Sequence, residues 1–252
     1  MRIPNTSKFN LLGIFTILAV ACSSAHGGLF TTIDISSVTN ANLQLTNSAF
    51  PAGLVTLGGV PFAIGSSGNN FYYSNPSGLS GTTTVSIPIN LSDVIGVHML
   101  INTVWGENVA GTFASLTFNF SDSTSFVKTL DGNVDVRDFY DNVFTNSING
   151  TTTQNVFLTD NDGRPFFTGL HRLDKQFIDL SAFSSKTLVS MTLIDNGAPG
   201  FQRTFLSGVT AESITAVPEP SSFAMAAIAL VGLLVGGRRS AKMFLVPPTT
   251  KV

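Results

Sequence analysis

A strict alternation of apolar and polar residues runs through ASLTFNF, residues 114–120. Successive side chains of a β-strand point to opposite sides, so the leucine and both phenylalanines of this stretch would share one face. The polar turn SDST (residues 121–124) follows, and SFVKTL (residues 125–130) continues after it. Two alternating segments joined by a short polar turn predict a β-hairpin.

Similar short segments recur from Gly28 onward, separated by Gly, Pro, Asn and Asp residues that favour turns. The expected strands lie at residues 31–35, 54–57, 59–64, 82–89, 96–105, 177–180, 186–195 and 205–214. In the seventh segment, the alternation places Leu188, Ser190, Thr192 and Ile194 on one face and Val189, Met191 and Leu193 on the other. Strands at this spacing, with no long helical period between them, predict a mostly β chain. We expect a single β-sandwich of jelly-roll type over residues 28–216.

The composition limits what this domain can bind. The chain has 252 residues, a net charge of -2 and a charged fraction of 11%, against about 25% in a typical soluble protein. Its Phe, Val, Ile and Leu residues are sufficient for a packed core. No basic patch is present to neutralise phosphates, so a nucleic-acid partner is not expected.

Residues 1–27 have the pattern of a signal peptide. Arg2 and Lys8 precede an apolar run at residues 11–21, and small residues follow. The alternative is a permanent N-terminal anchor, for which the run is shorter than the span of about 20 residues. The single cysteine, Cys22, is either removed with this leader or acts as a lipoprotein acceptor, although Ala19 stands where such acceptors usually have leucine.

The C-terminal end has three parts. Residues 217–222, VPEPSS, are rigid because each proline fixes its φ angle. Residues 223–237, FAMAAIALVGLLVGG, carry no charge, and a basic flank follows at Arg238, Arg239 and Lys242. This order predicts a transmembrane helix at about residues 223–237 with its positive flank in the cytoplasm. Because the run is barely long enough to span, we expect transient anchoring, with the domain outside the inner membrane and residues 243–252 as a cytoplasmic tail.

This tripartite end, residues 217–242, resembles the PEP-CTERM sorting domain of Gram-negative bacteria. The motif residues are Val217, Pro218, Glu219 and Pro220. The resemblance implies recognition by an exosortase, a transpeptidase-like membrane protein, with cleavage near the motif and a link to exopolysaccharide or biofilm. The tail after Lys242 departs from the family pattern, because such signals usually stop soon after the basic cluster.

A weaker resemblance concerns the middle of the chain. Residues 58–62, 101–106 and 173–180 look like parts of the galactose-binding-like jelly rolls of exported bacterial proteins. This resemblance implies ligand recognition at loops, with carbohydrate as one ligand class. No binding residue is transferred from that family.

The sequence contains no convincing catalytic constellation. It has no H-E-x-x-H zinc motif, no G-x-S-x-G elbow and no P-loop. We expect His98 to lie within a strand as a core or half-buried residue, and His171 to lie in a surface loop. Calcium is the one cofactor that we consider. Asp160, Asn161 and Asp162 offer closely spaced oxygen ligands before a glycine, as a calcium-binding turn can. The alternative for that segment is an Asx-type turn.

Aromatic residues suggest a binding surface. Neighbours on a strand alternate faces, so adjacent aromatics cannot all point inward. The clusters are Trp105, Phe71-Tyr72-Tyr73, Phe139-Tyr140 and Phe166-Phe167. We expect Tyr72, Tyr73 and Tyr140 to be exposed and able to stack on a ligand.

The leading functional hypothesis is an exported, non-enzymatic cell-envelope or extracellular-matrix protein that exosortase sorts and that is associated with extracellular polysaccharide. The second hypothesis is a carbohydrate-binding β-sandwich module. The third is an exported hydrolase.

Overall fold

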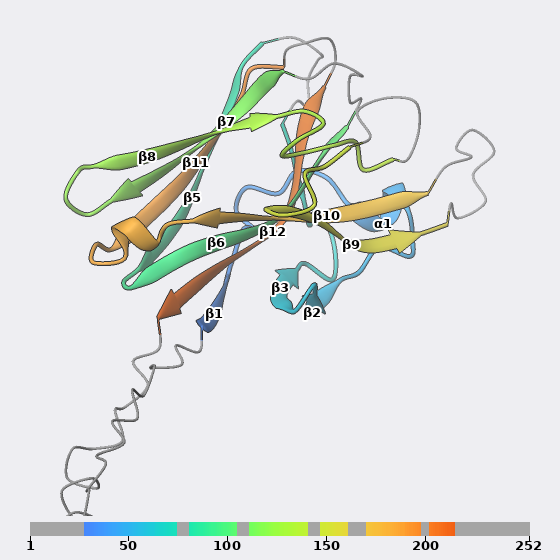
Figure 1. The fold of residues 1–252 in the computed structure, drawn as a ribbon. Helices are drawn as coiled ribbons and strands as arrows, with labels where there is room; N and C mark the ends of the chain where they lie inside the picture. The colour runs from blue at the N-terminus through green and yellow to red at the C-terminus, as the bar shows by residue number, and fades with distance from the viewer. Residues whose placement is uncertain are drawn as a thin grey trace, which may run out of the picture. The chain divides into compact units, whose positions relative to one another are not determined.

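The computed structural model describes residues 28–74, 81–104, 111–140, 147–160, 170–197 and 202–214. All of them lie within one unit of the chain, Gly27–Ala216. Strands dominate this part of the protein (Figure 1), so the prediction of a mostly β chain is confirmed.

The described strands form two large antiparallel sheets and a separate hairpin. The six-stranded sheet has the order β1 (Gly28–Ile33), β12 (Arg203–Ile214), β6 (Val94–Val104), β10 (His171–Asp179) and β9 (Thr153–Thr159), with β4 (Tyr72–Tyr73) paired to β12 beside this path. The four-stranded sheet has the order β5 (Thr83–Leu91), β11 (Leu188–Asp195), β7 (Thr112–Phe120) and β8 (Ser125–Asp131). The hairpin consists of β2 (Gly53–Leu57) and β3 (Val60–Ile64), and two short helices are α1 (Leu43–Thr46) and η1 (Ser181–Phe183).

The strand pairs are nested along the sequence, so that each pair encloses the next, and each pair lies within one sheet. Strand β1 pairs with β12, β5 with β11, β6 with β10, and β7 with β8. Successive pairs in this series alternate between the six-stranded and the four-stranded sheet. The chain therefore folds as one long antiparallel hairpin wound over both sheets.

The main hydrophobic core lies between the two sheets. Leu116 and Phe118 of β7 are fully buried, and they belong to the same cluster as Val97 and Met99 of β6. The predicted hairpin of residues 114–130 is confirmed as β7 and β8, with Phe118 paired to Phe126. Two sheets that bury their facing side chains in this way form a β-sandwich-like fold.

A second core covers the opposite face of the six-stranded sheet. Leu100 alternates with Met99 along β6 and packs in this cluster with Phe62 of β3 and Leu43 of α1. Strand β12 has Gly208 where β3 crosses it, and a Cβ atom there would lie 3.1 Å from the Phe62 ring. The β2–β3 hairpin and α1 thus bury the outer face of this sheet, and the described residues form three layers.

Two details of the strand predictions were wrong. A register shift between Leu188 and Ser190 places Leu188 in the core with Met191, while Val189 is exposed. A bulge of this kind shifts every preceding side chain to the other face, and the alternation alone does not reveal it. The expected strand at residues 177–180 is the end of β10, which begins at His171.

Several predictions concern residues outside the described part of the chain: the signal peptide with Cys22, the sorting motif, the membrane helix at about 223–237, the basic flank and the tail. Within the described ranges, no helix has the length and apolar character needed to cross a membrane.

Candidate functional site

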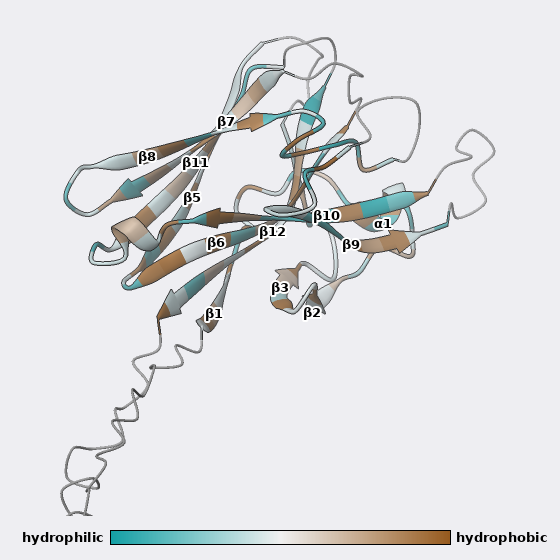
Figure 2. Ribbon diagram, in the orientation of Figure 1, coloured by the Kyte–Doolittle hydropathy of each residue, from teal (hydrophilic) through white to brown (hydrophobic). Residues whose placement is uncertain are grey.

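Strand β10 carries a polar sequence in a buried position. Figure 2 shows it as hydrophilic over its first part and hydrophobic toward its end. All six residues of HRLDKQ, residues 171–176, are nevertheless buried. His171 is 2% exposed, so its predicted place in a surface loop is wrong. Buried charges are costly unless they are paired, so this strand needs partners from elsewhere in the fold.

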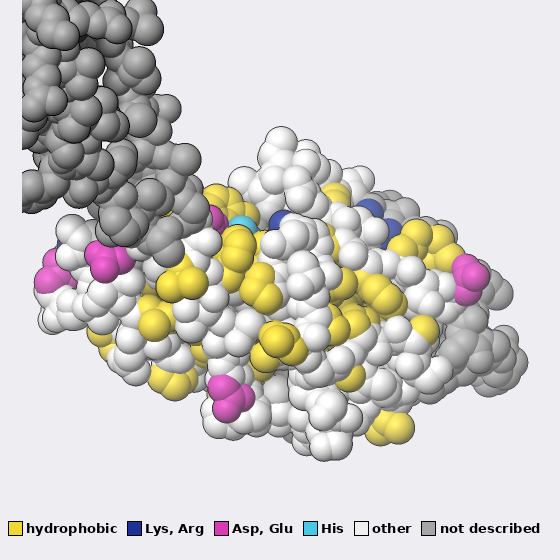
Figure 3. Space-filling model, turned by 90° about the horizontal axis from the view of Figure 1, so that it is seen from below, with side chains coloured by type: hydrophobic (Ala, Val, Ile, Leu, Met, Phe, Trp, Pro, Cys, Tyr) yellow, Lys and Arg dark blue, Asp and Glu magenta, His cyan; other side chains and the backbone are white. Residues whose placement is uncertain are grey.

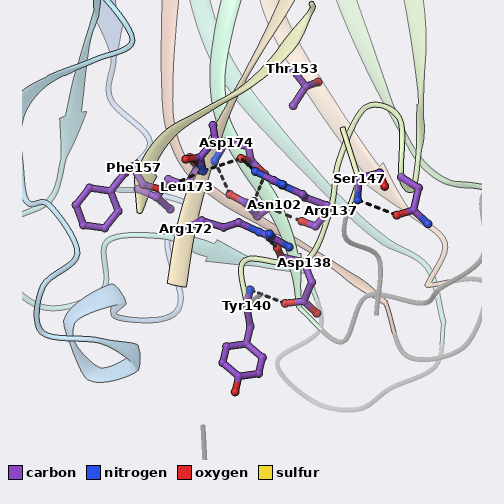
Figure 4. A network of polar contacts seen from close by, with 12 residues as sticks. Asn102, Arg137, Asp138, Tyr140, Ser147, Thr153, Phe157, Arg172, Leu173 and Asp174 are labelled. Carbon is purple, nitrogen blue, oxygen red and sulfur yellow. Dashed lines mark hydrogen bonds and ion pairs between the residues drawn. The ribbon is translucent and has the colours of Figure 1, made fainter. Parts of the chain in front are cut away.

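The carboxylate of Asp174 is the centre of these contacts (Figure 4). Its oxygens accept hydrogen bonds from Nε and Nη2 of Arg137, at 2.7 and 2.8 Å. The amides of Asn102 and Asn155 also donate to it, at 2.9 and 3.1 Å. Asp174 is fully buried and Arg137 is nearly so. A bidentate ion pair between one arginine and the carboxylate, with further hydrogen-bond donors, compensates well for the cost of burying that carboxylate.

A second arginine holds the segment that follows β8. Nε of Arg172 donates to the backbone oxygen of Asp138 at 2.9 Å. The backbone of Thr103, near the end of β6, accepts from Phe139 N and donates to Arg137 O, both at 2.9 Å. These bonds fix residues 137–139 against the six-stranded sheet and place Phe139 beside Phe205 of β12.

An aromatic pocket of about 300 Å³ lies next to this network. Phe139 and Phe205 stack at a centroid distance of 5.4 Å and an interplanar angle of 9°. Phe71 packs against Phe205 at 4.4 Å. The pocket is lined by Thr46, Phe71, Tyr73, Val104, Phe139 and Phe205. The three phenylalanines are buried members of the second core, so Thr46, Tyr73 and Val104 are the partly exposed residues of this lining, and none of them carries a charge at neutral pH.

Two of the lining residues, Tyr73 and Thr46, carry a hydroxyl group. Neither makes a hydrogen bond within the part of the chain that the structure describes. Burial raises the pKa of the Tyr73 phenol above its ordinary value, and the phenol is a hydrogen-bond donor at neutral pH, as an unperturbed phenol also is. Asn40 anchors the Tyr73 backbone through both amide atoms, each at 2.8 Å.

The three tyrosines that the sequence predicted to be exposed differ in their burial and surroundings. Tyr72 is buried in the core between the sheets, so its predicted exposure is wrong. Tyr73, its neighbour on β4, is half-buried and lines the pocket. Tyr140 is half-buried, with its ring centroid 5.3 Å from that of His171. Phe139 and Phe205 were not predicted, because a phenylalanine that lines a pocket has the same sequence pattern as one in a core.

The proposed calcium ligands are only partly described. Asp160 follows β9, and its backbone oxygen accepts a hydrogen bond of 3.0 Å from Nδ2 of Asn47. Asn161 and Asp162 lie outside the described residues. Among the described residues, no three His, Cys, Asp or Glu side chains gather closely enough to hold a metal ion. The calcium hypothesis therefore remains a prediction.

A separate buried cluster ties the two sheets together. The carboxylate of Asp195, at the end of β11, accepts hydrogen bonds from the backbone and hydroxyl of Thr204, at 2.6 and 2.7 Å. The hydroxyl of Ser74 donates to the same oxygen. One carboxylate oxygen thus serves three donors from β12 and the end of β4, and we interpret this cluster as structural.

His98 of β6 is the buried histidine that the sequence predicted. Its Nε2 atom lies 3.0 Å from Oε2 of Glu212, and its ring packs between Phe30 and Phe177. Burial lowers the pKa of His98 below 6.5, the nearby Lys175 acts in the same direction, and the hydrogen bond to Glu212 opposes both. The folded domain therefore resists protonation of this ring.

We expect the domain to lose stability as the pH falls below 6.5, the ordinary pKa of histidine. Above that value both folded and unfolded chains hold a neutral His98, and the stability is complete. Below it the unfolded chain binds a proton that the folded domain resists, so the free energy of unfolding decreases until the lower folded-state pKa is passed. Urea denaturation at about pH 8 and about pH 5.5 measures this loss.

The variant His98→Gln is the matched control, because glutamine keeps a donor for Glu212 without titrating. Its stability should change less between the two pH values than that of the wild type. Equal changes in the two proteins would show that His98 is not the group responsible.

The described residues therefore define a β-sandwich-like protein with a buried polar strand and an adjoining aromatic pocket. Residues 216–240 match the PEP-CTERM protein-sorting motif. The sorting motif predicted at residues 217–242 is therefore confirmed. Such a motif implies export, recognition by exosortase, which is a membrane protein, and transient membrane anchoring through the C-terminal signal. Among curated proteins, none matches the chain.

Proposed function

We propose that the chain is a non-enzymatic protein of the cell envelope or extracellular matrix, which exosortase sorts and which associates with extracellular polysaccharide. The observation that carries this proposal is the PEP-CTERM match at residues 216–240. After export, the sandwich domain would be released or retained outside the inner membrane by cleavage near Pro218-Glu219-Pro220.

The polar clusters of the domain support a non-enzymatic role. Asp174 accepts four side-chain hydrogen bonds, and Asp195 serves Ser74 and Thr204. Carboxylates saturated in this way stabilise the fold and are poorly placed to act as general bases. The nested strand pairs further support a jelly roll, since a double-sheet roll is a long hairpin wound over two sheets.

Carbohydrate binding is the second candidate function, and the aromatic pocket favours it. Tyr73 is the partly exposed aromatic ring of this uncharged pocket, and a single exposed ring can pack on the apolar face of a sugar. The exported hydrolase, the third hypothesis, has no cluster in its favour among the described residues.

Fractionation of the native host tests the leading proposal. We expect the processed protein to co-purify with extracted exopolysaccharide, and to show no turnover of polysaccharides or esters. Recovery only from the inner membrane would overturn the matrix assignment. Turnover that disappears on replacing an acidic residue would establish an enzyme. Calcium titration by calorimetry, with no heat and no gain in melting temperature, would remove the calcium hypothesis.

A further inference from the structure

We propose that a pocket between the loops that follow β1 and β3 binds one neutral sugar unit of a polysaccharide through Asp34, Ser66 and Asn69. This pocket, the loop pocket, has a volume of about 300 Å³ and is lined mainly by residues within 34–39 and 63–70. It shares no lining residue with the aromatic pocket. The inference rests on the proposed association of the protein with extracellular polysaccharide, and it adds a site for one sugar unit.

Hydrogen bonds within and between the two loops fix the walls of the loop pocket. The hydroxyl of Thr39 lies 3.1 Å from the backbone oxygen of Asn69 and 3.0 Å from that of Ser36. The buried amide of Asn70 donates to the backbone oxygen of Gly65 at 2.9 Å and so closes the second loop. A ligand therefore meets walls that are already ordered, which reduces the entropy lost on binding.

The carboxylate of Asp34 is the main acceptor of the loop pocket, and its residue is exposed. The backbone N–H of Ser36 donates to Oδ1 of Asp34 at 2.8 Å. This bond, followed by one from the Ser36 hydroxyl, lowers the pKa of Asp34 below 3.8. A carboxylate has about four acceptor sites, and Ser36 supplies two donors. Asp34 therefore keeps acceptor sites for the hydroxyls of a ligand, and bonds to an ionised group are the stronger ones.

Ser66 and Asn69 complement this acceptor. Both are exposed and line the pocket, and neither side chain makes a hydrogen bond among the described residues. A hydroxyl and an amide can each donate and accept, as the hydroxyls of a sugar require. The structure describes every residue that lines the pocket, and none of them is basic. An acidic sugar or a phosphate would thus face Asp34 without a counter-ion, which is unfavourable, so a neutral sugar fits best.

The size of the loop pocket limits the ligand to about one sugar ring. Its volume of about 300 Å³ is at the lower end of the range of ligand pockets, roughly 300–1,000 Å³. Gly53, Ala63 and Gly65 leave this space open because their side chains are small or absent. Ile35 and Ile64, 4% and 2% exposed, close the base of the pocket. The proposed contacts therefore come from the exposed polar rim and do not depend on this buried base.

A metal ion is a less suitable occupant of the loop pocket. Asp34 is the one carboxylate of its lining. Among the residues that the structure describes, no three His, Cys, Asp or Glu side chains lie close enough together to hold a metal ion. A single carboxylate does not replace the hydration shell of a cation such as calcium, which takes six to eight oxygen ligands.

Exposed apolar residues make a weaker case for a binding surface. Figure 3 shows hydrophobic side chains scattered over the face seen from below, among uncharged surface. Leu54 and Leu45 are 76% and 73% exposed, but neither lines the loop pocket. A single exposed leucine is normal on a protein surface and does not identify a partner.

The test is calorimetric titration of the processed protein, purified from its native host, with maltohexaose, cellohexaose, laminarihexaose and a uronic-acid hexamer. We expect at least one neutral hexasaccharide to bind and the uronic-acid hexamer to bind more weakly. Asp34→Asn keeps an acceptor for the Ser36 N–H but removes the charge, and it should weaken binding at least about tenfold. Ser66→Ala and Asn69→Ala each remove one polar group from the exposed rim and should weaken binding about threefold to tenfold.

Asp179→Asn is the matched control and should leave binding unchanged. Asp179 is also exposed, its Oδ1 accepts a bond of 2.8 Å from the backbone N–H of Ser181, and its pKa is also lowered, but it does not line the loop pocket. The melting temperature of each variant checks that it folds, and Ser66→Ala tests the site even if Asp34→Asn does not fold.

Four results would overturn the proposal. They are absence of binding to every neutral hexasaccharide, tighter binding of the uronic-acid hexamer, binding that all three pocket variants retain in full, and heat on titration with calcium chloride that Asp34→Asn removes. None of them bears on whether the protein co-purifies with extracted exopolysaccharide, which tests the proposed association, so the two proposals fail separately.

Discussion

Replacing Asp174 with asparagine is expected to lower the free energy of unfolding by about 3–5 kcal/mol, the usual cost of removing one partner of a buried ion pair. The substitution preserves the volume of the side chain but removes its charge. Arg137, whose side chain is 13% exposed, would then hold a guanidinium in the fold without its carboxylate. The amides of Asn102 and Asn155 would face an amide group where they now donate to a carboxylate.

Guanidinium denaturation of the full chain measures this effect, with the slope of the transition as a check that the unfolded state is unchanged. Asp122→Asn is the matched control. Asp122 pairs with Lys186 at 2.8 Å, and that bond lowers its pKa to about 2. The Asp122 carboxylate lies on the surface, so its loss should have a much smaller effect. Similar losses in both variants would show that the Asp174 network is not important for stability.

Replacing Pro218, Glu219 and Pro220 together with alanine is expected to abolish processing of the C-terminal end. The family match at residues 216–240 includes all three positions. Alanine would remove the fixed φ angles of both prolines and the single negative charge of the motif. Uncut precursor should then accumulate in the membrane fraction, which pulse labelling and fractionation would detect.

Pro247→Ala with Pro248→Ala is the matched control, because these two prolines lie in the tail outside the matched residues. Processing of this variant should match that of the wild type. If the triple variant were cut normally, the Pro-Glu-Pro residues would not be the recognised feature.

The hairpin of β7 and β8 could be predicted from the sequence because its information is local. ASLTFNF alternates, a polar turn follows, and the next segment is long enough to pair. Strand β10 could not be predicted over its full length, because HRLDKQ has the composition of a surface segment. Its burial depends on Asn102 and Arg137, which lie 72 and 37 residues away from Asp174 in the sequence. Such tertiary compensation leaves no periodic signal.

The candidate site was predictable only in part, for a similar reason. The adjacent aromatics Tyr72-Tyr73 indicated that the two rings lie on opposite faces, and the structure places Tyr72 in the core between the sheets and Tyr73, half-buried, against the second core. Phe139-Tyr140 gave the same type of signal, yet Phe139 is the member that reaches the pocket. Which member of a pair turns inward depends on the hydrogen bonds between residues 137–139 and β6, and these form only in the fold.

The central claim is that this chain is exported and sorted through its C-terminal motif, and the intact mass of the protein recovered from its native host tests it most directly. We predict a mass that lacks both the leader, about residues 1–27, and the residues after the Pro-Glu-Pro motif. The same spectrum would reveal any lipid on Cys22. A mass equal to the full 252 residues, or to the chain without its leader but with residues 221–252 intact, would contradict this account of sorting.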